Sequence, residues 1–212
     1  PKTVRRQKFS SMNDKCAGGT GAVIDKISAK LGIPAQHLSQ MGYDGQRLHA
    51  VAGKCGVFAE TDINSLQKVG VPSSELMASL FEAIVAQNLS ILTRGNTLQP
   101  QVLLLGGPNT FIRGLAEAWR YNIARLWTER GIDLPAGTTI EDQVIVPAGA
   151  QYFAALGAAR FGLQDEMRDT VFLGSSALKR FVSVGQVQQK RKAGSEGLIR
   201  DSQELAAFRE RF

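Results

Sequence analysis

Gln101-Val102-Leu103-Leu104-Leu105-Gly106-Gly107-Pro108-Asn109 is the stretch that indicates the fold class. Its apolar run is short and continuous, which is typical of a parallel strand covered on both faces. Two glycines and a proline end the strand, and apolar residues recur at helical spacing from Ile112 to Trp127. A strand, a glycine turn and a helix in this order indicate α/β organisation.

The same organisation extends to both sides of this stretch. Upstream, apolar residues between Leu76 and Leu92 cover most of a helix circumference, which predicts a central, buried helix. Either Ser73 or Ser74 is expected to cap it. The remaining predicted elements are an edge strand at Thr3–Phe9, a helix from about Thr20 to Leu31, a short helix after Pro34, a turn at Gly42–Gly45, a helix at Glu60–Val69, a strand at Val144–Val146, a helix at Ala150–Phe161, a helical stretch within Met167–Val187 and a last helix at Asp201–Phe212.

Composition restricts the class of protein. The chain has 212 residues, two cysteines and a net charge of +6, so it is long enough for one domain or one large lobe. We find no signal peptide and no apolar run near the ~20 residues that span a bilayer, and we expect a cytoplasmic protein without a membrane partner. Basic residues gather near both ends without a recognition motif, so we expect no nucleic acid partner.

The two cysteines, Cys16 and Cys55, each lie beside a glycine just before a predicted helix. Backbone N–H groups and the helix dipole favour the thiolate at such a place, and the thiolate is the form that binds metals. A tetrahedral zinc or iron–sulfur site needs four ligands. Two thiolates provide half of them, and a symmetric dimer would provide all four. Two ordinary buried cysteines are the alternative.

Two glycine-rich turns are candidate ligand contacts. Gly106-Gly107 at the end of a strand would let a ligand approach the backbone, and a following helix N-terminus favours phosphate or adenosine contacts. Gly18-Gly19-Thr20-Gly21 lacks the Lys-Ser/Thr of a Walker A motif, but it could contact a nucleotide. A tight packing turn is the alternative for both. We interpret Glu60 and Asp62 as helix N-terminal residues that complement the dipole, without acid–base roles.

Five segments together resemble one family. They occur in the order Asn13-Asp14-Lys15-Cys16-Ala17-Gly18-Gly19-Thr20-Gly21, Cys55-Gly56-Val57-Phe58-Ala59-Glu60, Leu104-Leu105-Gly106-Gly107, Val146-Pro147 and Ala155-Leu156-Gly157-Ala158-Ala159. The set is similar to the BadF/BadG/BcrA/BcrD family, specifically the activators of 2-hydroxyacyl-CoA dehydratases and benzoyl-CoA reductases. The resemblance covers about Lys8 to Gly162, and the cysteine-centred motifs are its specific part.

The resemblance implies a fold. Members have the acetate/sugar kinase–Hsp70–actin (ASKHA) fold, in which two ribonuclease-H-like lobes enclose a nucleotide. Residues 1–164 then correspond to the C-terminal lobe, and residues 165–212 are a helical and basic extension similar to the segment after this lobe in long activases. The N-terminal lobe with its phosphate-binding turns is expected to precede Pro1, so this chain alone should hydrolyse ATP poorly or not at all.

The resemblance also implies cofactors and partners. Cys16 and Cys55 correspond to ligands of a [4Fe-4S] cluster shared between two chains or two repeats. Gly106 and Gly107 correspond to contacts of ATP or ADP with Mg, and Asn109, Gly19 and Gly21 are further candidate contacts. ATP hydrolysis would drive a low-potential electron into a 2-hydroxyacyl-CoA dehydratase or benzoyl-CoA reductase, and ferredoxin or flavodoxin would be the donor. Catalytic residues are not assigned.

Two other functions fit the same fold. A sugar or small-molecule kinase lobe would need a catalytic aspartate near a phosphate-binding turn, and it would need no cysteine ligands. A non-catalytic regulatory module would keep the fold without ATP turnover. The contexts of Cys16 and Cys55 favour the activator. One departure from the short activators is Gly18, which stands where they usually have alanine.

Overall fold

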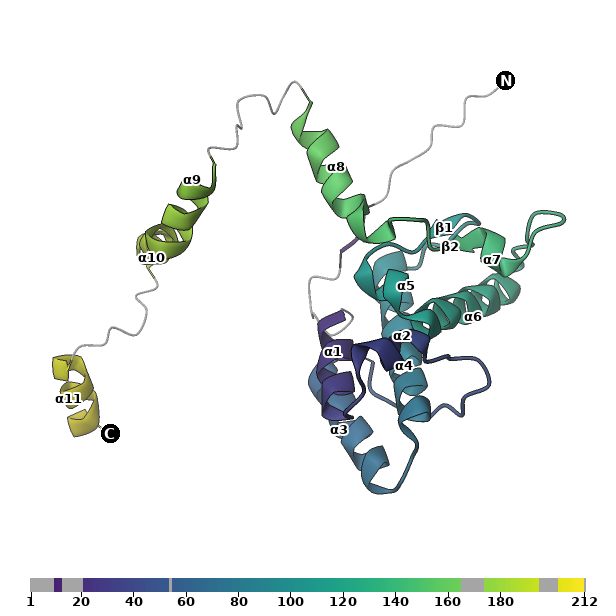
Figure 1. Ribbon diagram of the computed structural model, residues 1–212, viewed down its shortest axis with the longest axis horizontal. Helices are drawn as coiled ribbons and strands as arrows, with labels where there is room; N and C mark the ends of the chain where they lie inside the picture. Colours follow the sequence, from purple (N-terminus) through teal and green to yellow (C-terminus); the bar gives the residue numbers. More distant parts are fainter. Residues whose placement is uncertain (1–9, 13–20, 54, 165–173, 195–201, 212) are drawn as a thin grey trace. The chain divides into compact units, whose positions relative to one another are not determined.

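The computed structural model describes residues 10–12, 21–53, 55–164, 174–194 and 202–211 (Figure 1). The chain divides into two units, Pro1–Gly157 and Ala158–Phe212. The predicted strand at Thr3–Phe9 lies outside the described residues, and the predicted boundary between residues 164 and 165 stays a prediction.

The first unit is mostly helical and contains a small parallel sheet. Its elements are α1 (Gly21–Lys30), α2 (Ala35–Gln40), α3 (Gly56–Lys68), α4 (Ser73–Thr93), β1 (Val102–Leu103), α5 (Gly107–Phe111), α6 (Arg113–Glu129), α7 (Ile140–Gln143), β2 (Val144–Ile145), the 3₁₀ helix η2 (Ala150–Tyr152) and the start of α8 (Phe153–Gly162). Strands β1 and β2 pair in parallel, with Val102 opposite Val144 and Leu103 opposite Ile145. The α/β order of strand, helix and strand predicted around Gly106 is therefore present.

Helix α4 is the centre of the larger apolar core. Leu76, Met77, Leu80, Phe81 and Val85 on this helix are all fully buried, and each such side chain contributes roughly 1.5–3 kcal/mol through removal from water. The prediction of a central, buried helix is confirmed. Among the described helices α4 alone has the length and apolar composition to cross a membrane, and its burial accounts for that composition here.

A smaller cluster lies under the sheet. Leu104, Ile123, Trp127 and Val144 form it, and Trp127 Nε1 donates a hydrogen bond to the carbonyl of Leu98 at 2.7 Å. On β1 itself Leu103 remains half exposed, so the described residues do not cover both faces of this strand. The prediction of a strand covered on both faces is therefore wrong for this part of the chain.

Three helix ends differ from the predictions. Pro72, in extended conformation, precedes α4 as its cap residue without a side-chain hydrogen bond, so neither Ser73 nor Ser74 caps it. Helix α3 begins at Gly56, four residues before the expected start, because Cys55 is its cap residue. The helix expected after Asn109 is divided at Ile112, whose extended backbone (φ −113°, ψ 103°) accompanies a side chain that is buried in the core.

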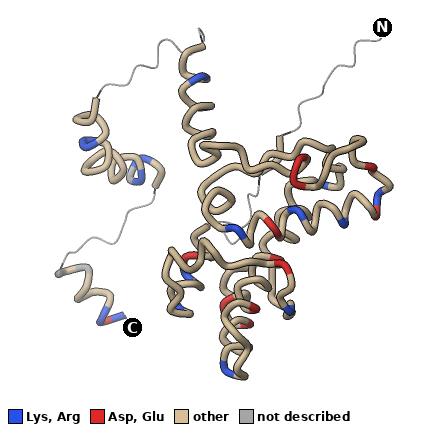
Figure 2. Tube along the Cα trace, turned by 45° about the vertical axis from the view of Figure 1, so that its right-hand side comes forward, with Lys and Arg blue, Asp and Glu red and all other residues tan. Residues whose placement is uncertain are grey.

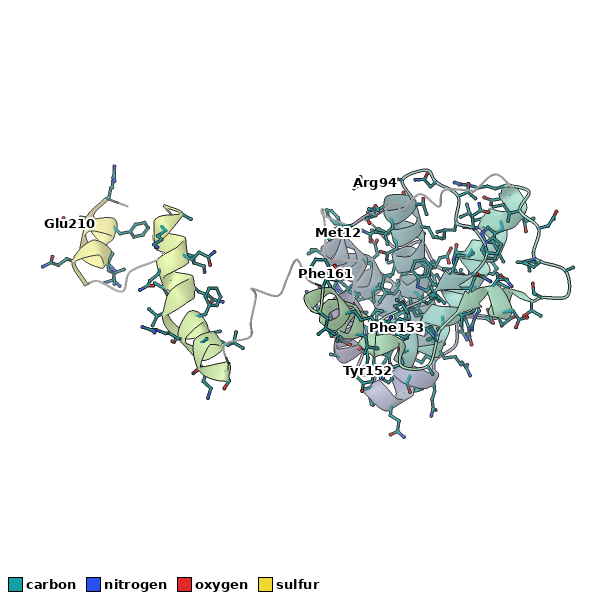
Figure 3. The ribbon with its side chains drawn as sticks, turned by 90° about the horizontal axis from the view of Figure 1, so that it is seen from above. Met12, Arg94, Tyr152, Phe153, Phe161 and Glu210 are labelled. Atoms are coloured by element: carbon teal, nitrogen blue, oxygen red, sulfur yellow. The ribbon has the colours of Figure 1, made fainter. Side chains whose placement is uncertain are left out.

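The second unit is helical where the structure describes it. It contains the end of α8, then α9 (Ser175–Arg180), the π-helical turn η4 (Phe181–Gly185), α10 (Gln186–Lys192) and α11 (Ser202–Arg211), which confirms the helical character predicted for the tail. Lysine and arginine residues occur along α9 and α10 without an acidic residue (Figure 2). Phe161 in this unit is an exposed aromatic residue, as are Tyr152 and Phe153 at the end of the first unit (Figure 3).

Candidate functional site

Cys55 is the cap residue of α3. Its backbone is extended (φ −148°, ψ 126°) and the first helical residue follows directly. The thiol is partly buried and forms no disulfide. The backbone N–H groups of Phe58 and Val57 lower the pKa of the Cys55 thiol, because they stabilise the thiolate. This shift favours the thiolate, the form of cysteine that binds metals, and the assignment of Cys55 as a metal ligand stays a prediction.

Two contacts hold the chain just before Cys55. The backbone N–H of Ala52 donates a hydrogen bond to Asp62 Oδ2 at 2.8 Å. At Gly53 an added Cβ would lie 2.7 Å from the carbonyl oxygen of Ala83 on α4, so only glycine lets the chain pass this close to the helix. Both contacts place Cys55 relative to the core of the first unit.

Two ion pairs that share the carboxylate of Glu60 connect α3 to α1. Lys26 Nζ lies 2.6 Å from Glu60 Oε2, and Lys30 Nζ lies 3.0 Å from Glu60 Oε1. Lys26 and then Lys30 lower the pKa of the Glu60 carboxyl through these hydrogen bonds. Figure 1 shows α1 beside α3. The interpretation of Glu60 and Asp62 as dipole-complementing residues is wrong: the first turn of α3 has no acidic residue, and these two carboxylates instead bind α1 and the chain before Cys55.

The other predicted ligand, Cys16, lies outside the described residues, and so does Gly19. In the part of the chain that the structure describes, no three His, Cys, Asp or Glu side chains gather as a metal site. The donor chemistry of Cys55 fits an iron–sulfur cluster, since a thiolate at a helix N-terminus is the ligand such a cluster takes. Cys55 would be one of four ligands, so a cluster at this place would need its other ligands from outside the described residues.

A hollow of about 350 Å³ lies where α1, α4, α5 and α6 meet. Its lining residues come from all four helices and the end of β1: Gly21, Ile24, Ile84, Asn88, Leu92, Leu105, Pro108, Asn109, Leu115 and Trp119. The fold thus brings together Gly21 and Asn109, two of the predicted nucleotide contacts that are 88 positions apart in the sequence (109 − 21). A Cβ at Gly21 would lie 2.8 Å from Cγ of Pro108, so glycine permits this approach of α1 to α5.

The glycine pair has the geometry of a tight turn. Gly106 has φ 93° and ψ 165°, a backbone conformation that is strained for any residue with a side chain, and its N–H donates to the carbonyl of Ala150 at 3.1 Å. Around Gly107 an added Cβ would meet no atom, so a ligand could approach the backbone there. Helix α5 has only five residues, which weakens the predicted contribution of a helix dipole to phosphate binding.

Asn109 presents an unsatisfied polar atom beside the hollow. Its Nδ2 donates to the carbonyl of Leu105 at 2.9 Å, and its Oδ1 is buried with no hydrogen-bond partner among the described residues. Buried acceptors are usually paired, so this oxygen is a candidate for a ligand hydrogen bond. Sequence reasoning missed Asn88 and Trp119 as lining residues, because their helices show only the apolar periodicity of a core.

Comparison with known proteins identifies the family. Residues 3–122 match the sequence profile of the BadF/BadG/BcrA/BcrD ATPase family. The 2-hydroxyisocaproyl-CoA dehydratase activator of Clostridioides difficile is 27% identical over 159 residues, which are 75% of this chain and 52% of that protein. The (R)-2-hydroxyglutaryl-CoA dehydratase activating ATPase of Acidaminococcus fermentans is 27% identical over 150 residues, 71% of this chain and 50% of that protein.

The fold agrees with this similarity. A solved structure of the activator of the 2-hydroxyisocaproyl-CoA dehydratase from Clostridium difficile, with bound ADPNP, resembles this chain with a TM-score of 0.54 at 25% identity. The match covers 74% of this chain and 52% of that chain. The chain spans about half the length of the curated relatives it matches. Because the family profile covers more than half of its residues, the chain belongs to the BadF/BadG/BcrA/BcrD ATPase family.

Proposed function

We propose that this chain is one lobe of an ATP-dependent activator that delivers low-potential electrons to a CoA-ester dehydratase or reductase. The named relatives that support this role are activators of 2-hydroxyacyl-CoA dehydratases. The observation that carries the proposal is Cys55 at the start of α3, where backbone N–H groups favour the thiolate. A kinase lobe or a regulatory module has no need of such a thiol.

The electron carrier in this proposal is a [4Fe-4S] cluster. Cys16 and Cys55 would each donate a thiolate, and the same pair from a second chain or a second repeat would complete the four ligands. When bound, the cluster supplies one-electron chemistry. The protein places Cys55 through contacts of Gly53, Asp62 and Glu60 with neighbouring elements.

An exposed apolar pair supports a protein partner beside Cys55. Val57 and Phe58 follow this cysteine in the first turn of α3 and are 64% and 65% exposed. Large apolar side chains with this exposure are typical of protein interfaces when they gather at one place. A homodimer or a repeat pair with the cluster at the contact would cover them.

The hollow beside α5 is the proposed adenosine side of a site for ATP or ADP with Mg. Gly106 and Gly107 would let the nucleotide approach the backbone, and Asn109 Oδ1 would accept a hydrogen bond from it. Gly21 lines the same hollow, and Gly19 lies two positions before it in the sequence. In the ASKHA arrangement a second lobe would contribute the phosphate contacts, so this chain alone should turn over ATP poorly.

The proposal also includes an electron acceptor, an electron donor and a cellular location. The acceptor would be a 2-hydroxyacyl-CoA dehydratase or a benzoyl-CoA reductase, and the donor would be ferredoxin or flavodoxin. A cytoplasmic location agrees with the free thiol of Cys55, since thiols persist in a reducing compartment.

The cluster is tested by anaerobic reconstitution of the chain with iron and sulfide. We expect broad absorption near the blue edge of the visible range, together with incorporated iron and sulfide. Cys16→Ser and Cys55→Ser should each abolish both signals. A wild-type protein that stays colourless and iron-free, while it remains folded by circular dichroism, would overturn the assignment.

The nucleotide site is tested by calorimetric titration with ADPNP. Asn109→Ala removes the unpaired acceptor and should weaken binding by about five- to tenfold, the effect of one lost hydrogen bond. Asn96→Ala is the matched control, because Asn96 only donates to the nearby carbonyl of Thr93. Equal affinities for the two variants would show that Asn109 does not contact the nucleotide.

A further inference from the structure

We propose that Glu60 is a positioning residue that fixes α3, the helix that Cys55 precedes as its cap residue, against α1. The link runs through Lys26 and Lys30 and does not depend on any bound group. Its consequence for an iron–sulfur cluster rests on the proposed function.

The geometry gives each oxygen of one carboxylate its own partner. Glu60 Oε2 accepts from Lys26 Nζ at 2.6 Å, and Oε1 accepts from Lys30 Nζ at 3.0 Å. The lysine side chains are 64% and 43% exposed, whereas the Glu60 side chain is 18% exposed. The Glu60 side chain is therefore mostly covered, whereas both lysines of α1 remain open to solvent. A network of this kind is more effective than an isolated surface pair.

The arrangement also removes a repulsion within α1. Lys26 and Lys30 are four positions apart, so their charges lie on the same helix face and destabilise α1 when they are unpaired. A single carboxylate from α3 neutralises both. Loss of Glu60 therefore removes the ionic link between the helices and returns the repulsion to α1.

Apolar burial of α1 and α3 does not fix the orientation of one helix on the other, and the two ion pairs of Glu60 can do so. Ile24 and Ile27 of α1 share the core cluster with Ala59 and Ile63 of α3. Burial in this shared core does not by itself set the direction of one helix relative to the other, because the hydrophobic effect is non-directional. Each of the two hydrogen bonds has a preferred donor–acceptor distance and direction, and Glu60 lies only five positions after Cys55. They are thus suited to fix how the beginning of α3 sits on α1.

The first measurement uses the metal-free chain and follows amide hydrogen exchange by mass spectrometry. In Glu60→Gln, the amides of α1 should exchange about two- to fivefold faster than in the wild type, as expected for loss of an ion-pair network. The matched control is Glu117→Gln, because Glu117 has nearly the same exposure (19%) but pairs with Arg113 on its own helix and accepts from the backbone N–H of Tyr43, neither of which belongs to α1. It should leave α1 unchanged. In a Lys26→Met/Lys30→Met background, Glu60→Gln should add no further effect.

The second measurement uses the reconstituted protein and compares electron paramagnetic resonance spectra and midpoint potentials. Glu60→Gln should change the line shape or shift the potential, and Glu117→Gln should change neither. Unchanged exchange of α1 in Glu60→Gln would refute the link between the helices. Faster exchange together with an unaltered cluster signal would refute the positioning role. A wild-type chain that takes up no cluster would instead refute the proposed function, and the exchange result would still decide the link.

Discussion

The backbone N–H of Ala52 donates a 2.8 Å hydrogen bond to Oδ2 of Asp62, which joins the chain just before Cys55 to the helix just after it. Asp62→Ala leaves this partly buried N–H without an acceptor, and it should lower the free energy of unfolding by about 1–3 kcal/mol. Urea unfolding followed by circular dichroism measures this change. Asp62→Asn keeps an acceptor oxygen and should lose less. Equal losses in the two variants would show that the hydrogen bond is unimportant.

Gly53 should not tolerate a side chain. In Gly53→Ala the new Cβ would lie 2.7 Å from the carbonyl oxygen of Ala83, so the chain before Cys55 must move away from α4. We expect a loss of about 1–3 kcal/mol in the free energy of unfolding, typical of overpacking. The control is Gly157→Ala on α8, where a Cβ meets no atom and helix propensity favours alanine by about 1 kcal/mol. A neutral Gly53→Ala would contradict the close approach.

Tyr43 should make the stability depend on alkaline pH. Burial, and then the hydrogen bond from its hydroxyl to Glu82 Oε2 at 2.7 Å, raise the pKa of Tyr43 well above its ordinary value. Since the folded pKa exceeds the unfolded value of about 10, the contribution of Tyr43 is complete below that pH and is lost as pH rises toward the folded pKa. The midpoint of urea unfolding should therefore fall steeply above about pH 10.

Tyr43→Phe separates this effect from general alkaline unfolding. It removes one hydrogen bond and should lower stability at pH 7 by about 1 kcal/mol, but its stability should decline less steeply in alkali. Tyr152→Phe is the control, because Tyr152 is exposed. The urea-unfolding midpoints of Tyr43→Phe and the wild type are compared from about pH 8 to 11, around the ordinary tyrosine pKa. If the two midpoints decline in parallel as pH rises, a group other than Tyr43 causes the alkaline loss of stability.

The parts of the fold that depend on periodicity could be predicted from the sequence. The apolar stripe of α4 and the run before Gly106 predicted a buried helix and a strand, because these patterns follow from burial of one continuous surface. The break of the following helix at Ile112 was not predictable. Helical spacing continues through this residue, and only its packing in the core selects the extended backbone.

In the candidate site, too, the local features could be predicted from the sequence and the long-range contacts could not. The helix after Cys55 is predictable from sequence, since a cysteine and a glycine before an apolar periodicity are local signals. The contacts that place Cys55 are long-range: Gly53 approaches Ala83, and Glu60 reaches Lys26 across 34 positions. No local pattern encodes such pairs, and local signals alone therefore suggest a dipole contact for the carboxylate of Glu60. Only the fold brings these residues together.

Phe58 should be important for association and unimportant for folding. Its ring is 65% exposed beside Cys55, so Phe58→Ser should change the free energy of unfolding by no more than about 0.5 kcal/mol. If a second copy covers this face when the cluster forms, the same change removes an aromatic anchor from the contact. The dimer of reconstituted protein should then weaken by about tenfold or more, on the order of 1.4 kcal/mol or above. Anaerobic sedimentation equilibrium measures this.

Phe111→Ser on α5 is the matched control, because Phe111 is similarly exposed at 60% but does not adjoin Cys55 in the sequence. Equal weakening by both variants, or by neither, would place the contact between copies on another face.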